Sequence, residues 1–369
     1  MTDLFSPFTL RDVTFPNRIG VSPMCMYSCA EDGRPTEWHL QHLVSRAMGS
    51  GMVMVEASAV TPEGRISPAD VGIWEDAQIP GHARLAAGIA AMGAVPAIQI
   101  AHAGRKASRN PPWQGGPAPD GWVPVGPSAL AFGDYAAPRA MAEAEIRATI
   151  AAFAAAARRS VAAGYRLVEL HAAHGYLLHQ FLSPLSNRRN DAWGGDFDGR
   201  ARFTLEAAAA VRAALPKGIP FAVRLSHTDW MEGGWNTEET VELARRLKAL
   251  GVDLADVSSG GLHADQKIPL GPLYQVPGAV AVKQGAGIAV AAVGLITEPE
   301  EAQSVIAEGK ADLALLARAF LRDPYWSLRA AAALGATERL IVPPQYERGW
   351  NTLGRMHRAD AIGRPLPPL

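Results

Sequence analysis

The sequence predicts an α/β fold, a single (β/α)8 TIM barrel, and three observations lead to it. Eight short apolar runs alternate with helical patterns along the 369 residues, and no linker divides them. This alternation favours one barrel over two domains. A doubly wound open sheet usually carries a glycine-rich fingerprint after its first strand, whereas Pro23–Met26 follows the first strand here. We therefore expect one barrel.

The expected strands are short and apolar, and several lack polar alternation, as strands buried on both faces do. They are Ile19–Ser22, Gly51–Val55, Val95–Ile100, Tyr165–Leu170, Phe221–Leu225, Leu254–Val257, Ile288–Ala292 and Leu313–Leu316. Residues 3–16 precede them and predict a small β-hairpin with the polar pair Arg11-Asp12 at its turn.

Helical patterns separate most of these strands. They are Trp38–Met48, Gly81–Met92, Glu143–Ala163, Gly199–Leu215, Thr237–Leu250 and Pro299–Glu308, with Phe320–Ala333 after the last strand. Thr237, followed by acids, resembles an N-cap, and Gly251 ends the same helix. Residues 110–139 form a long loop rich in proline and glycine, typical of a segment over a functional site or of a mobile surface excursion.

Composition excludes several classes of function. A net charge of −1 gives no electrostatic case for nucleic acid or an anionic membrane. The two cysteines, Cys25 and Cys29, are too few for a disulfide framework or a cysteine-ligated iron–sulfur cluster. The N-terminus lacks the pattern of a signal peptide, and no apolar run is long enough to span a bilayer. We expect a cytoplasmic protein.

The motif His171-x-x-His174-x-Tyr176 follows the fourth strand, at the barrel end where active sites form. Two imidazoles can bind a metal, with His102 as a third ligand. They can instead hold one carbonyl or nitro oxygen while the phenol delivers a proton to carbon. They can also be ordinary rim side chains.

Other strand ends carry groups that suit a redox cofactor. Cys25 follows the first strand and is either a buried thiol or a group that tunes a nearby redox ring. Gln99 and Arg224 suit the pyrimidine edge of a flavin, although Arg224 can equally pair with an internal carboxylate. Gly294 and Arg318 lie in the last two strand–helix loops, the usual phosphate site of this fold. Gly260-Gly261 also lets backbone approach a ligand.

Several motifs recur in the order found in Old Yellow Enzyme reductases, which this chain resembles from residue 3 to about residue 350. They are Leu4–Leu10, Pro16–Ile19, Ser22–Ser28, Glu56–Val60, Gln99–Lys106, His171–Leu177 and Phe181–Arg189. Cys25 and the segment 345–350 are similar to the thermophilic-like ene-reductase subgroup. We expect an FMN-binding barrel over residues 1–350 and an unassigned tail over 351–369.

The resemblance implies a non-covalent FMN, reduced by NADPH or NADH, that reduces activated alkenes. It implies His171 and His174 as the pair that binds and activates the substrate, Tyr176 as proton donor and Tyr27 as a substrate contact. It also implies a homodimer or homotetramer in which Arg348 enters a neighbour's site. The implied cofactor-binding residues are Ser22, Pro23, Met24, Cys25, Ala57, Gln99, Arg224, Ala317 and Arg318, with Gly294 added by its position in the loop.

Two alternatives remain on sequence grounds. One is a metal-dependent hydrolase on the same barrel that uses His102, His171 and His174. The other is a barrel that only stores flavin. The sequence decides neither the physiological substrate nor the preference between NADPH and NADH.

Overall fold

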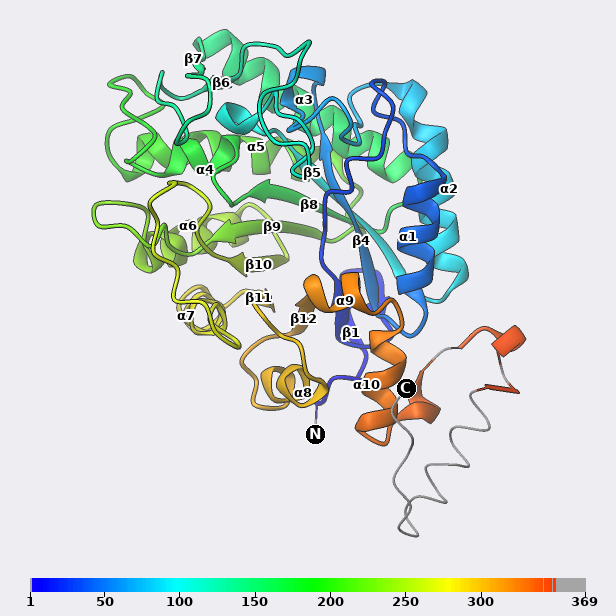
Figure 1. Cartoon of the computed structure of the whole chain (residues 1–369). Coiled ribbons are helices and arrows are strands. Elements are labelled where there is room, and N and C mark those ends of the chain that lie inside the picture. The colour runs from blue at the N-terminus through cyan, green and yellow to red at the C-terminus, as the bar shows by residue number, and fades with distance from the viewer. Residues whose placement is uncertain (1, 341, 347, 350–369) are drawn as a thin grey trace.

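The computed structural model describes residues 2–340, 342–346 and 348–349, and its strands close into one parallel barrel (Figure 1). The hydrogen-bonded order β10-β11-β12-β3-β4-β5-β8-β9 returns to β10. The predicted (β/α)8 barrel is thereby confirmed. Its strands are β3 (Ile19–Val21), β4 (Met52–Ala59), β5 (Val95–Ala101), β8 (Leu167–Ala172), β9 (Phe221–Ser226), β10 (Leu254–Ser258), β11 (Ala289–Ala292) and β12 (Leu313–Leu316).

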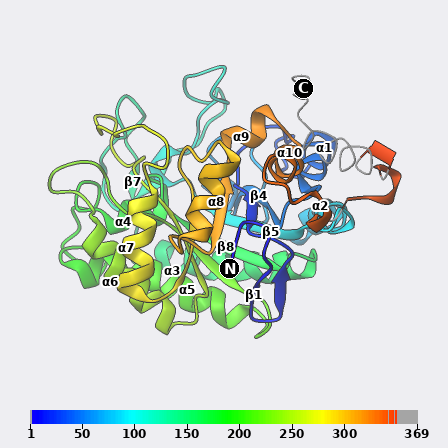
Figure 2. The same cartoon turned by 90° about the horizontal axis from the view of Figure 1, so that it is seen from below.

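Helices surround the strands, as the view from below shows (Figure 2). They are α1 (Glu37–Ala47), α2 (Ile79–Ala91), α3 (Glu143–Ala162), α4 (Leu177–Leu182), α5 (Phe197–Ala214), α6 (Thr237–Ala249), α7 (Val276–Ala286), α8 (Pro299–Ala307), α9 (Arg318–Arg322) and α10 (Trp326–Ala333). Within the described part of the chain, no helix is long and apolar enough to cross a membrane.

The helices differ from the sequence expectations in four respects. Helices α4 and α7 were not expected, and Phe320–Ala333 is two helices rather than one. The break falls at Asp323-Pro324, because proline supplies no backbone N–H to continue a helix. The N-cap of α6 is Asn236, whose side chain accepts the Glu239 N–H, and Thr237 is the first helical residue.

The predicted hairpin exists as β1 (Phe8–Leu10) and β2 (Val13–Phe15), paired antiparallel. Phe15 is fully buried and belongs to a cluster with the inward-facing side chains at the lower ends of the strands. The hairpin therefore closes the barrel end opposite the site. This interior cluster comprises Val13, Phe15, Met52, Met54, Val95, Ala97, Leu167, Ala222, Leu254, Ala291, Leu313 and Leu315.

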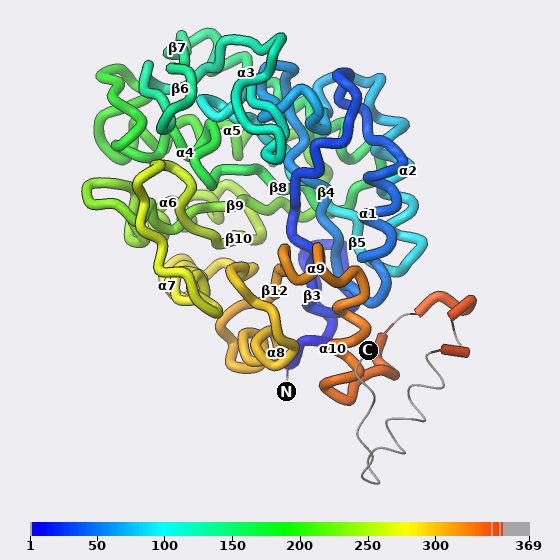
Figure 3. The backbone as a smooth tube through the Cα atoms, in the orientation of Figure 1, coloured from blue at the N-terminus to red at the C-terminus, as the bar shows by residue number. Residues whose placement is uncertain are grey.

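Two long loops lie over the other end of the barrel, one between β5 and α3 and one between β10 and α7 (Figure 3). The first contains the short pair β6 (Val125–Gly126) and β7 (Arg139–Ala140). The loops are tied together by Arg105, whose guanidinium donates to Leu130 O at 3.1 Å and Leu262 O at 2.7 Å. Both loops are thus fixed beside the strand ends.

Candidate active site

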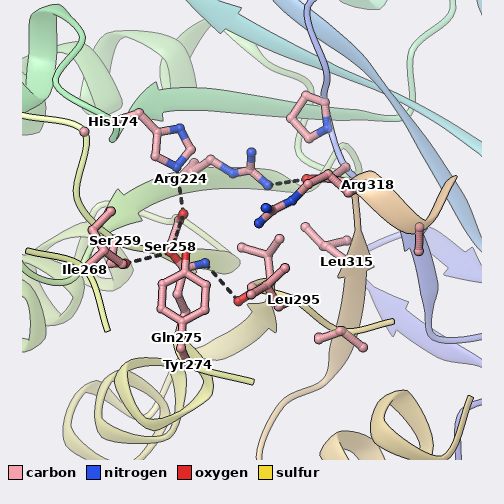
Figure 4. Close-up of a pocket in the computed structure, with 18 of the residues that line it drawn as sticks. His174, Arg224, Ser258, Ser259, Ile268, Tyr274, Gln275, Leu295, Leu315 and Arg318 are labelled. Carbon is pink, nitrogen blue, oxygen red and sulfur yellow. Dashed lines mark hydrogen bonds between the residues drawn. The ribbon is translucent and has the colours of Figure 1, made fainter. Parts of the chain in front are cut away.

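A cavity of about 440 Å³ opens where the strands end, within the size range of small-molecule sites (Figure 4). It is lined from the ends of β3, β8, β9, β10, β11 and β12 and from the long loop before α7. The side chains that the argument uses are Ser22, Lys106, His174, Tyr176, Arg224, Ser258, Gln275 and Arg318.

Strand register brings charged side chains together inside the barrel. Arg224 on β9 pairs in register with His171 on β8 and with Asp256 on β10. Arg224 Nε donates to Asp256 Oδ2 at 2.5 Å, and its Nη2 donates to Ser22 Oγ at 2.8 Å. Glu169 Oε1 lies 3.8 Å from Arg224 Nε. The expected internal arginine–carboxylate pair is therefore present, in a side chain that also reaches the cavity.

Two buried carboxyl groups share this one guanidinium. Burial, opposed by Arg224, raises the pKa of Asp256, and burial and the neighbouring Asp256 charge raise the pKa of Glu169 well above its usual value. Gln99 Nε2 donates to Glu169 Oε1 at 2.7 Å. Two carboxylates this close resist ionising together, so the pair retains a proton near neutral pH. The remaining single negative charge of the pair then neutralises the Arg224 guanidinium.

The rings of His171, His174 and Tyr176 meet edge to face. The His171 ring centroid lies 5.1 Å from that of His174 and 5.0 Å from that of Tyr176. The loop turns sharply here, because His174 has φ 57° and Gly175 has φ 70°. A side chain at Gly175 would collide with Gly261 O, so the left-handed turn also brings the β8 and β10 loops into contact.

Burial, assisted by nearby cations, keeps both imidazoles neutral. Burial lowers the pKa of His174 well below its usual value, and the charges of Arg224 and Lys106 lower it further. The pKa of His171 falls for the same reasons, with His174 as an additional cause. The Lys106 ammonium donates to His174 O at 2.8 Å and also to Gly261 O. Neutral imidazoles act as hydrogen-bond donors and not as acids of the ordinary histidine kind.

The hydrogen bonds of the two rings indicate where ligand contacts are available. The Ala173 N–H donates to His171 Nδ1 at 3.3 Å, so a neutral His171 carries its proton on Nε2. His174 Nε2 shares a 2.7 Å hydrogen bond with Ser258 Oγ (Figure 4). Ser258 has a single hydroxyl proton, which it can give either to His174 Nε2 or to Gln275 Oε1 at 3.2 Å. When it gives the proton to His174, the His174 proton lies on Nδ1 and is available to a ligand, and Ser259 remains the donor to Gln275.

Cys25, Tyr27 and Tyr176 lie next to one another and all remain protonated. Burial raises the pKa of Cys25 well above its usual value, although its thiol bonds to the Ala57 backbone and the Tyr27 side chain. Burial also raises the pKa of Tyr27 and Tyr176, with Cys25 as the next cause in each. Cys25 is thus an uncharged thiol and Tyr176 an uncharged phenol.

The opposite part of the cavity contains the groups predicted for a phosphate. Gly294 has φ 125°, and a side chain there would meet Gln275 Nε2 at 2.8 Å. The position thus needs glycine and leaves its backbone open to the cavity. Arg318 lines the same region and is exposed (Figure 4). A forked cation beside free backbone suits a phosphate, and Arg224 suits the polar edge of a flavin, so these residues fit FMN.

Several predicted residues lie outside the cavity lining. Gln99 is buried against Glu169, Met24 packs against the core, and Ala57 lines a small adjoining pocket with Tyr176. Arg348 is exposed and lines neither this cavity nor that pocket. The predicted tail, 351–369, lies outside the described residues. The predicted cofactor residues that line the cavity are Ser22, Pro23, Arg224, Gly294, Ala317 and Arg318.

The hydrolase alternative gains no support from the described residues. They contain no group of three or more side chains placed to hold a metal ion. His102 is buried, and its Nδ1 accepts the Gly104 N–H at 3.0 Å. It orders the loop after β5 and does not line the cavity.

Sequence reasoning missed four participants. Lys106 was noted within a motif but was given no role. Asp256 and Glu169 were detectable, because a carboxylate in an otherwise apolar buried strand needs a cationic partner. The loop residue Gln275, whose Oε1 accepts from Ser258 and Ser259 at 3.2 and 2.7 Å, carries no comparable signal.

The chain is similar to known proteins over most of its length. The model of the NADH:flavin oxidoreductase / NADH oxidase family matches residues 3–336. An NADPH dehydrogenase of Geobacillus sp. (strain WCH70) is 46% identical over 352 residues, which cover 95% of this chain and 99% of the relative. An NADPH dehydrogenase of Listeria innocua is 44% identical over 353 residues, which cover 95% of this chain and 100% of the relative.

Solved structures agree with these matches. Morphinone reductase superposes with a TM-score of 0.76 at 27% identity, over 93% of this chain and 91% of its own. An old yellow enzyme homologue from Zymomonas mobilis superposes with a TM-score of 0.74 at 25% identity, over 90% of this chain and 93% of its own.

Proposed function

This chain belongs to the NADH:flavin oxidoreductase / NADH oxidase family, and we propose that its reaction is the reduction of alkenes activated by a carbonyl or nitro group. The observation that carries the proposal is the contact of the neutral His171 imidazole with both the neutral His174 imidazole and the Tyr176 phenol, beside the cavity that Arg224 lines. These groups can stabilise a developing enolate and protonate it.

The chain is an oxidoreductase, and its cofactor is FMN. When bound non-covalently, FMN would supply the hydride chemistry that links NADPH or NADH to the β-carbon of the alkene. Arg224 and Ser22, which are hydrogen-bonded to each other, would contact its polar ring edge, and Gly294 and Arg318 would contact its phosphate. Cys25 lies outside the cavity lining and remains a neutral thiol hydrogen-bonded to Tyr27.

The protein's own groups act on the acceptor. Nε2–H of His171 and Nδ1–H of His174 donate to the carbonyl or nitro oxygen, where negative charge grows during hydride addition. The Tyr176 hydroxyl then gives its proton to the α-carbon, and water returns a proton to the phenolate. A phenol with a raised pKa stays protonated until a strongly basic carbanion forms. Hydride and proton together saturate the C=C bond.

The first test uses the colour of the purified protein. NADPH added without oxygen should bleach the flavin, and cyclohexenone should restore it. A bleached protein that cyclohexenone does not reoxidise would favour another electron acceptor. A colourless protein that binds zinc and no flavin would overturn the proposal.

Replacing Tyr176 with phenylalanine separates the two half-reactions. Tyr176→Phe removes the proton donor and keeps the ring, so we expect reoxidation by cyclohexenone to slow about 10²-fold or more, with little effect on reduction by NADPH. Stopped-flow absorbance of the flavin measures both steps. Tyr325→Phe, at a 45% exposed tyrosine, is the control. Equal slowing of both steps would remove Tyr176 from this role.

We also propose a homodimer or homotetramer in which Arg348 contributes to a neighbour's site. In the single chain Arg348 lies after the short helix Pro344–Tyr346 and lines no part of the cavity. Arg348→Ala should then raise the KM for cyclohexenone in the associated enzyme. A protein that sediments as a monomer in analytical ultracentrifugation and is fully active at the same concentration would contradict this proposal.

A further inference from the structure

A second cavity of about 320 Å³ adjoins the first beneath the loop between β5 and α3. Lys106 and Tyr176 line both cavities, so the two meet at the proposed proton donor. The second cavity is largely aromatic and basic, and its described lining includes no Asp or Glu. Its lining residues are Tyr27, Ile66, Lys106, Arg109, Asn110, Pro112, Gly115, Gly116, Phe132, Tyr135 and Tyr176.

Arg109 is held rigidly but keeps its hydrogen-bond donors available. Its backbone is fixed by the Arg109 N–H bond to Ile66 O at 2.7 Å and by a bridge to Pro117. Its guanidinium carbon lies 3.8 Å from the Tyr135 ring centroid. Within residues 2–340, this guanidinium makes no side-chain hydrogen bond or ion pair with a carboxylate. A stacked, half-buried guanidinium with free donors is suited to a planar anion.

Lys106 adds partial positive charge where the two cavities meet, because burial and the neighbouring Arg105 lower its pKa to about 7. Its Nζ lies 4.1 Å from the Phe132 ring centroid and 5.5 Å from that of Tyr176, and its hydrogen bonds go to backbone carbonyls. No described carboxylate forms an ion pair with either Lys106 or Arg109. The cavity therefore attracts anions and repels cations.

Tyr176 fixes how an acceptor must lie. Its hydroxyl has to reach the α-carbon, so the alkene lies at the junction between the cavities. The rest of the acceptor then extends among the aromatic rings toward Arg109. We propose that this enzyme prefers flat aromatic acceptors that carry a carboxylate at the end remote from the alkene, with Arg109 binding that carboxylate. This inference rests on the proposed ene-reductase function.

A matched pair of acceptors tests the inference. The FMN-loaded enzyme reduces 4-carboxycinnamaldehyde or its methyl ester, with NADPH as electron donor. We expect kcat/KM to be about tenfold higher for the acid, the size of one charge-assisted hydrogen bond at a partly exposed site. Arg109→Gln should abolish that preference and leave the ester unchanged. Arg109→Lys should retain part of it, because the charge remains without the fork.

Controls separate local recognition from the overall field and from loss of fold. Arg202→Gln removes an exposed charge on α5 that lines neither cavity, and it should keep the preference. The preference should shrink as salt is raised. Equal kcat/KM for acid and ester in the unaltered enzyme, or an unchanged preference in Arg109→Gln, would overturn the inference and leave the ene-reductase function standing.

A binding measurement keeps the inference testable if turnover fails. The dissociation constant of 4-carboxycinnamaldehyde for the FMN-loaded protein is measured by quenching of tryptophan fluorescence. Trp113 is a suitable reporter, because its ring lies 5.8 Å from that of Tyr27 on the cavity wall. We expect tighter binding of the acid than of the ester, lost in Arg109→Gln. Absence of reduction with this binding intact would refute the proposed function alone, and equal binding of both compounds would refute the inference.

Discussion

The buried carboxyl of Glu56 makes stability depend on pH in a direction that can be calculated. Glu56 lies on β4, is 3% exposed, and its Oε1 accepts the Met26 N–H at 3.0 Å. Burial raises its pKa from 4.5 to about 8, and the nearby Asp70 charge acts the same way. His39 Nε2 lies 3.6 Å from Glu56 Oε2, and burial lowers the pKa of His39 to about 4. Both groups are therefore neutral at pH 7.

The sign follows from proton binding. Between pH 4.5 and 8 the unfolded chain releases the Glu56 proton while the folded chain keeps it, so folding is weakened as pH rises. Release of the Glu56 proton stabilises the unfolded chain more than the folded chain, by the equivalent of about 2.5 pKa units at pH 7 and about 0.6 units at pH 5. Each unit is worth about 1.4 kcal/mol. Between pH 5 and pH 7, Glu56 should thus remove about 2.5 kcal/mol from the free energy of unfolding.

The variant Glu56→Gln isolates this contribution, because the amide keeps an acceptor for Met26 and cannot ionise. Urea unfolding at pH 5, 6 and 7, at constant ionic strength and with saturating FMN, measures it. The unaltered protein should lose about 2.5 kcal/mol more than the variant over that range. Glu300→Gln, at an exposed position on α8, should follow the unaltered protein. Parallel pH profiles, or a variant weakest at pH 7, would show instead an ionised Glu56 paired with protonated His39.

Two further substitutions test the barrel interior. Asp256→Asn removes the main partner of Arg224, but Glu169 lies 3.8 Å from the guanidinium and can take over as its carboxylate partner. We therefore expect the free energy of unfolding to fall by less than the ~3–5 kcal/mol of an unpaired buried ion, and FMN to bind more weakly in a fluorescence titration. Unchanged stability and affinity would contradict the charge network. Phe15→Ala should cost about 3–5 kcal/mol of unfolding free energy in urea, and Phe8→Ala, at a half-buried ring, clearly less; equal losses would show that the hairpin does not close the barrel.

The barrel strands were predictable because parallel strands buried on both faces are continuous apolar runs. Helix α7 was missed, since Val276–Ala286 contains a proline and two glycines, which are poor helix formers. It forms because Pro277 occupies the first turn and one face packs into the core. Burial in the folded protein thus outweighs the low helix propensity of this segment, and no local sequence pattern indicates that burial.

Active sites of (β/α)8 barrels form at the C-terminal ends of the strands, and this rule located the candidate site better than any single motif. His174, Arg224 and Arg318 were predicted from strand ends alone, and all line one cavity. The role of Lys106 was not predictable, because its hydrogen bonds cross to the loops after β8 and β10. Contacts between loops depend on the packed fold and leave no trace in sequence spacing.

The electrostatics of the site assign different tasks to its groups. Burial, and then the charges of Arg224 and Lys106, hold the pKa of His174 below its usual value, so the imidazole can donate a hydrogen bond without giving up its proton. A protonated imidazole beside the same oxygen would compete with Tyr176 as proton donor and would direct the proton to oxygen. In the proposed reaction, burial and the cations together therefore leave the phenol as the group that protonates carbon. Lys106 thus contributes both to this selectivity and to the positive charge of the second cavity.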